Sequence, residues 1–141
     1  VVGSPPQRST WQIGVQHPDR LDEDIAALSL RAGTYSAVAT STTRRRQWKR
    51  GDRSINHLID PATGRAVDIE TPSVTVVANT VTQAEIETKS AIVSAARGDE
   101  ISPLHASLIL LTYPDGTYES ITCKAFSSSG MDSGYPTGSA A

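Results

Sequence analysis

Three groups of side chains in this sequence have types and spacings that suit chemistry at a phosphate or a ring system. The first is the segment His57-Leu58-Ile59-Asp60, which leads into a proline turn. A histidine there could contact a phosphate or a ring carbonyl, could exchange a proton near neutral pH, or could be structural. If residues 56–59 are extended, His57 and Ile59 share one face and Leu58 and Asp60 the other. That disfavours a simple His–Asp pair.

Asp60 also has a strong structural interpretation. The pattern Asp-Pro-x-x-Gly, here residues 60–64, is typical of a turn that begins with an aspartate and ends with a glycine. Proline fixes φ at the second position. We therefore interpret Asp60, Pro61 and Gly64 as turn formers that aim the strand before them.

The second group is a basic cluster that surrounds an aromatic ring, Trp48. Its cations are Arg44, Arg45, Arg46, Lys49, Arg50 and Arg53. Guanidinium forks fit phosphate, so the cluster could clamp a diphosphate or an acidic partner. It could equally be a solvated loop that balances the acidic run 19–24. Basic and aromatic residues together also bind RNA, but a single such loop on a chain of net charge −2 favours no nucleic-acid partner.

The third group is Glu85, Thr88 and Lys89, whose spacing places them on one face of a predicted helix. A carboxylate and a hydroxyl there could hold a hard divalent ion such as Mg²⁺. The alternative is structural, because Glu85 would complete a capping box that begins at Thr82 and would pair with Lys89 along the helix.

The elements that position these groups follow from the hydrophobic pattern. Strands are expected at residues 11–15, 25–30, 35–40 and 73–78, with a hairpin turn at 31–34 between the second and third. The basic segment 44–53 is expected to be an exposed loop or a ragged edge ribbon. A helix should run from Thr82 to a stop at Gly98, and a terminal hairpin should pair residues 106–113 with 117–124. This pattern predicts an α+β fold with a mostly antiparallel sheet.

Length and composition limit the class of protein to which this chain can belong. The 141 residues predict one domain with a real core, and the single cysteine, Cys123, permits no disulfide within the chain and is expected to be a core residue. No apolar run has the length of a membrane span, and no signal peptide is visible. The segment Ser127–Ala141 is rich in serine and glycine without periodicity, so we expect a disordered tail.

The order of these pieces resembles the FAD:protein FMN transferases, the ApbE-like family long labelled thiamine-biosynthesis lipoproteins. Family members look like W-x-[VI]-G-[VI]-x-x-P, then A-[VI]-A-T-S-G, H-[IL]-I-D-P-x-T-G, S-V-T-V-[VI]-A and A-D-x-x-x-T. The matching segments here are Trp11–Pro18, Ala37–Ser41, His57–Gly64, Ser73–Ala78 and Ala84-Glu85. The resemblance implies that residues 1–126 are the C-terminal part of an ApbE-like domain.

The resemblance also implies an activity. Such an enzyme uses Mg²⁺, splits the pyrophosphate of FAD and attaches FMN through its phosphate to a Thr or Ser of an acceptor flavoprotein. Carried over by position, His57 would be catalytic, and it would line the flavin site with Leu58 and Ile59. Thr40 and Ser41 would lie beside that site. Glu85 would take the place of a metal-binding aspartate, with Thr88 as a second ligand.

The chain departs from the family pattern in three ways. Thr42 stands where the family has a glycine, and Glu85 and Lys89 replace the metal-site residues, so Lys89 would add a positive charge. The N-terminal half of the family domain is absent, so we expect it in cis or as a partner chain, and we expect this fragment alone to be inactive. The alternative is a non-catalytic FAD-binding or partner-docking module with a degenerate metal site. Relatives are often periplasmic or membrane-anchored, and the compartment of this chain stays open, the cytoplasm included.

Overall fold

The computed structural model describes residues 5–6, 8–68 and 70–123. The expected tail at 127–141 lies outside these residues. In chain order the elements are β1 Thr10–Gln16, β2 Asp24–Arg31, β3 Ala37–Ser41, β4 Gln47–Arg50, β5 Arg53–Asn56, β6 Ile59–Asp60, β7 Arg65–Ala66, β8 Ser73–Ala78, α1 Val81–Arg97, β9 Ala106–Thr112 and β10 Tyr118–Thr122. All strand pairs among them are antiparallel, which confirms the predicted α+β class.

A four-stranded sheet in the order β10-β9-β8-β3 forms the centre of the molecule. The predicted strand Ser73–Ala78 is β8, and all six of its residues are buried because both faces of the sheet are covered. The predicted terminal hairpin is also confirmed, since β9 and β10 pair across the turn 113–117.

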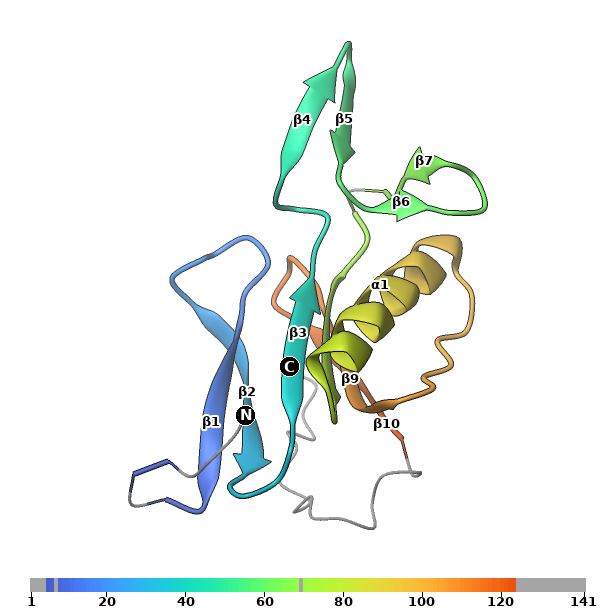
Figure 1. Cartoon of the computed structure of the whole chain (residues 1–141). Coiled ribbons are helices and arrows are strands. Elements are labelled where there is room, and N and C mark those ends of the chain that lie inside the picture. Colours follow the sequence, from blue (N-terminus) through green and yellow to red (C-terminus); the bar gives the residue numbers. More distant parts are fainter. Residues whose placement is uncertain (1–4, 7, 69, 124–141) are drawn as a thin grey trace.

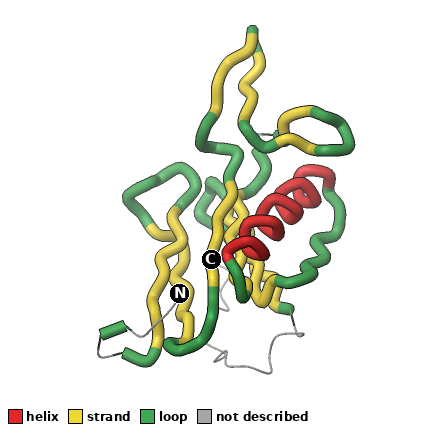
Figure 2. The backbone as a smooth tube through the Cα atoms, in the orientation of Figure 1, coloured by secondary structure: helices red, strands yellow, loops and turns green. Residues whose placement is uncertain are grey.

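Alternation along the sheet strands divides the core into two layers of side chains. Val76 and Ile109 pack on the side where α1 lies, whereas Val77 and Leu108 pack against the β1–β2 hairpin. Figures 1 and 2 show the helix and the hairpin in these separate positions around the sheet. The fold therefore has three layers, with the sheet between the helix and a two-stranded hairpin.

The strands on either side of residues 31–34 do not pair with each other, so the predicted hairpin is wrong. Strand β2 pairs with β1, and β3 pairs with β8 instead. Leu28 and Leu30 are buried with β1 in one layer of the core, while Ala37 and Ala39 are buried under the helix. The turn at Gly33, whose φ is +76°, thus carries the chain from one layer to the next rather than back along the same sheet.

Helix α1 begins two residues earlier than the predicted capping box allows. Thr80 is the N-cap, and its Oγ1 accepts a hydrogen bond from the Gln83 backbone N–H at 3.2 Å. Thr82 and Glu85 therefore lie inside the helix, so the predicted box is wrong by two positions. The predicted stop is confirmed, because Gly98 is in the left-handed region and its N–H reaches the Ala95 carbonyl.

The basic segment forms a hairpin, β4–β5, that projects beyond the sheet next to the short β6–β7 ribbon (Figure 1). All four residues of β4 are exposed, which matches the predicted edge ribbon. Among the described residues, no helix is both long and apolar enough to cross a membrane.

Candidate functional site

The segment His57–Asp60 connects β5 to β6 and has the predicted alternation. His57 and Ile59 are exposed, whereas Leu58 and Asp60 are buried. Leu58 is anchored on both sides, since its N–H donates to Asn56 Oδ1 at 2.9 Å and its carbonyl accepts from the Val67 N–H at 2.9 Å. The segment is therefore held by its buried positions and presents the histidine and the isoleucine outward.

Asp60 forms the predicted turn and has a second role that sequence reasoning missed. Its Oδ1 accepts from the Ala62 N–H at 2.8 Å, and its carbonyl accepts from the Gly64 N–H at 2.8 Å. Arg97, the last residue of α1, forms an ion pair with the carboxylate and also donates from Nε to Oδ2 at 3.0 Å. This guanidinium is the main reason that the pKa of Asp60 is lowered to about 2.

Thr40 and Ser41 point to opposite faces of the sheet because they are successive residues of β3. Ser41 Oγ lies 2.8 Å from Thr88 Oγ1 on the helix side, which brings together two of the predicted site residues. Thr88 donates its proton to the Glu85 carbonyl, so the Ser41 hydroxyl is the donor between the two. Thr40 instead bonds Thr75 Oγ1 at 2.9 Å, on the other face.

The predicted metal ligands have protein partners. The carboxylate of Glu85 forms an ion pair with Lys89, as the structural alternative anticipated, and Thr88 is fully buried. Within the described ranges, no group of three or more His, Cys, Asp or Glu side chains could hold a metal ion. A single carboxylate that is already neutralised by an ammonium does not fit Mg²⁺, which prefers several oxygen ligands and water.

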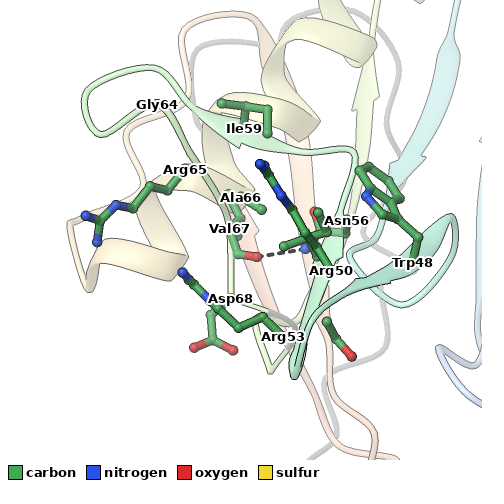
Figure 3. A pocket seen from close by; sticks show the side chains of 12 residues that line it. Trp48, Arg50, Arg53, Asn56, Ile59, Gly64, Arg65, Ala66, Val67 and Asp68 are labelled. Atoms are coloured by element: carbon green, nitrogen blue, oxygen red, sulfur yellow. Dashed lines mark hydrogen bonds between the residues drawn. The ribbon is translucent and has the colours of Figure 1, made fainter.

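An open hollow of about 590 Å³ lies between the β4–β5 hairpin and the β6–β7 ribbon (Figure 3). Its lining residues are Trp48, Arg50, Arg53, Ser54, Ile55, Asn56, Ile59, Gly64, Arg65, Ala66, Val67 and Asp68. Asn56 closes its floor by donating from Nδ2 to the Val67 carbonyl at 2.7 Å. Ile59 therefore joins the histidine segment to this hollow.

The structure separates the basic cluster into two parts. Arg44 forms ion pairs with Asp19 and Glu70, and Arg45 donates to the Gln16 side chain. The Arg44–Asp19 pair corresponds to the predicted balance against the acidic run, whereas Glu70 and Gln16 lie outside that run. Arg50 and Arg53, at the end of the hairpin, line the hollow instead.

Cys123 is half-buried beyond the end of β10, where burial raises the pKa of its thiol. A raised pKa leaves little reactive thiolate near neutral pH. Cys123 belongs to neither core cluster, so the expected core position is wrong.

Fold and site together define a three-layer α+β domain that presents an exposed histidine beside an arginine-lined hollow. The ApbE family model matches residues 1–102. The chain is 29% identical over 79 residues to a FAD:protein FMN transferase of Salmonella typhimurium, a match that covers 56% of this chain and 22% of the relative. It also resembles the crystal structure of the ApbE protein of Thermotoga maritima, with a TM-score of 0.68 and 27% identity, over 88% of this chain and 39% of that one.

The chain belongs to the ApbE family, as the order of its motifs predicted. It spans well under half of the length of each of these two relatives.

Proposed function

We propose that this chain is the C-terminal part of a FAD:protein FMN transferase. Membership of the ApbE family, together with an exposed histidine in the segment His57–Gly64, is the observation that carries the proposal. The relative in Salmonella typhimurium bears that activity in its name. In the proposed reaction, a Thr or Ser hydroxyl of an acceptor flavoprotein attacks the FMN phosphorus of FAD. A new P–O bond forms, the pyrophosphate bond breaks, and AMP leaves.

His57 is the residue in this chain that we expect to take the proton of the attacking hydroxyl. Its side chain is exposed, and a neutral imidazole can accept a proton near neutral pH. Ile59, also exposed, would give the flavin ring an apolar surface. Leu58 is buried, so its contribution would be to fix the positions of the residues on either side of it.

Thr40 and Ser41 would support the site rather than touch the flavin together, because they face opposite sides of the sheet. Ser41 would act through the buried hydroxyl pair with Thr88, which ties the end of β3 to the helix. In this proposal the pair positions the strand that leads into the basic hairpin.

The resemblance also implies that the reaction uses Mg²⁺, with Glu85 and Thr88 as the ligands of the ion. Their contacts with Lys89 and Ser41 do not fit that role, so no step of the reaction is assigned to a metal held by this chain. The same observation favours a second candidate function, a module that binds FAD or docks a partner without turnover. The N-terminal half of the family domain, in cis or as a partner chain, would complete either protein.

Flavin transfer tests the proposal in a protein that joins this chain to that N-terminal half. The protein is incubated with FAD, with and without Mg²⁺, and with an acceptor domain that carries the target threonine. Covalent FMN on the acceptor, detected by mass and by in-gel fluorescence, is the expected result. FAD binding without any transfer would select the non-catalytic module.

His57→Ala should lower the rate of transfer by about 100-fold, the lower end of what a positioned acid or base contributes. His105→Ala is the matched control, because His105 is also exposed but lies in the segment between α1 and β9. Equal rates for the His57 variant and the unmodified protein would make His57 structural.

A further inference from the structure

Two arginines stand directly opposite each other at the end of the β4–β5 hairpin. Arg50 pairs with Arg53 across the two strands, and only Gly51 and Asp52 separate them in the chain. Like charges in such a cross-strand pair destabilise a hairpin. Neither guanidinium has a hydrogen bond or ion pair within the part of the chain that the structure describes, whereas Arg44 has two acidic partners. An anion between Arg50 and Arg53 would remove the repulsion.

The same face of the hairpin carries an aromatic ring. Successive strand residues alternate between faces, so Trp48 shares a face with Arg50, and Lys49 points to the opposite one. The lining of the hollow agrees, because it includes Trp48 and both arginines but not Lys49. Half of the Trp48 side chain is exposed, which leaves its ring available for stacking with a base.

The size and charge of the hollow suit a small anionic ligand. Its volume of about 590 Å³ lies within the range of small-molecule sites. Figure 3 shows the guanidinium ends of Arg50 and Arg53 over the hollow, with Arg65 at its rim and Asp68 at its edge. The guanidinium forks of Arg50 and Arg53 can each offer paired N–H groups to phosphate oxygens.

We propose that Arg50 and Arg53 bind the diphosphate of a nucleotide whose base stacks on Trp48. The inference rests on the proposed function, because the nucleotide is the ADP moiety of FAD. Asn56 and Ile59 line the hollow on either side of His57 in the chain, so the bound diphosphate would lie next to the segment assigned to the flavin. The aromatic wall of the hollow favours a nucleotide, whose base can stack on it, over an acidic peptide.

The test uses the protein that joins this chain, isotopically labelled, to the N-terminal half of the family domain. ADP is added, and the indole N–H signals of Trp11 and Trp48 are followed by NMR. ADP should shift the Trp48 signal to saturation and leave that of Trp11, on β1, in place. Adenosine should bind more weakly than ADP. The double variant R50Q/R53Q should lose about tenfold or more in ADP affinity. K49Q removes the same charge from the opposite face and should change the affinity by less than about twofold.

The double variant should keep the hairpin, since it removes a repulsion. Agreement of its Trp48 signal without ADP with that of the unmodified protein shows that the hairpin is intact. A Trp48 signal indifferent to ADP would overturn the proposal, as would equal losses in R50Q/R53Q and K49Q. Displacement of ADP by a polyglutamate peptide at lower concentration would assign the hollow to an acidic protein partner. If R50Q/R53Q still transfers FMN and the protein does not bind ADP, the transferase proposal stands and the proposed nucleotide site is wrong. If the protein binds ADP but transfers no FMN, the nucleotide site stands and the transferase proposal is wrong.

Discussion

Asp60 shows at the scale of a single residue how a turn former can also join two elements. The carboxylate holds its own turn through the Ala62 N–H and fixes the C-terminal end of the helix through Arg97. This ion pair keeps the histidine segment attached to α1, because Asp60 follows His57 by three residues. The pair spans 37 positions in the chain, and no local pattern marks Arg97 as the partner.

The lowered pKa of Asp60 predicts a specific loss of stability in acid. A carboxyl with a folded pKa of about 2 and an ordinary unfolded value of 3.8 contributes fully above about pH 4. The contribution disappears as the pH falls from about 4 to 2, because the unfolded chain binds the proton first. Urea unfolding between pH 5 and 2 should therefore show a shallower decline for Asp60→Asn than for the unmodified chain. Asp22→Asn, an exposed control, should follow the unmodified chain; identical slopes for all three would exclude the role of the pair.

Among single residues, those governed by local rules were predictable. The alternation from His57 to Asp60 and the Asp-Pro turn were confirmed because both depend on neighbours in the chain. The contacts of Ser41 with Thr88 and of Asp60 with Arg97 were not predictable, since tertiary packing alone makes them. Glu87 was also missed: it is buried, and its Oε1 accepts from the N–H groups of Leu104 and His105.

At the scale of elements, the helix start depends on one hydroxyl. Two threonines, Thr80 and Thr82, each precede a polar residue three positions on, so the sequence offers two overlapping capping boxes. The structure selects Thr80 and Gln83. Strand β8 ends at Ala78, so this start leaves only two residues between strand and helix.

Thr80→Ala should lower the free energy of unfolding by about 1 kcal/mol, because the Gln83 N–H loses its acceptor. Thr82→Ala should change it by less than about 0.5 kcal/mol, since that side chain is exposed inside the helix. Chemical denaturation of the two variants measures both values. A larger loss in the Thr82 variant would restore the capping box that the sequence suggested.

Strand pairing is the feature of elements that sequence reasoning resolved least well. Neighbouring strands in a sequence usually pair, which is why residues 25–30 and 35–40 were expected to form a hairpin. Packing decided otherwise: the apolar residues of β2 belong to the layer with β1, and those of β3 belong to the layer under α1. Hydrophobic alternation locates the strands but does not say which layer each one joins.

At the scale of the whole molecule, a three-layer core supports a hairpin and a ribbon that project from it (Figure 1). The central sheet, the helix and the β1–β2 hairpin carry most of the buried residues, and the histidine segment joins this core through Leu58. All four residues of β4 in the basic hairpin are exposed. This division leaves the exposed parts open to a ligand and to further protein. The chain spans 39% of the Thermotoga maritima ApbE protein, so we propose that the N-terminal half of the family domain supplies the opposite side of the site.

Covalent flavin on an acceptor is the most direct measure of the central claim. The protein that joins this chain to the N-terminal half is mixed with FAD and with an acceptor domain, and the mass of the acceptor is determined. We expect a gain of one FMN on the acceptor and no gain on a variant whose target threonine is replaced by alanine. An acceptor of unchanged mass, with and without Mg²⁺ and despite FAD binding, would contradict the transferase.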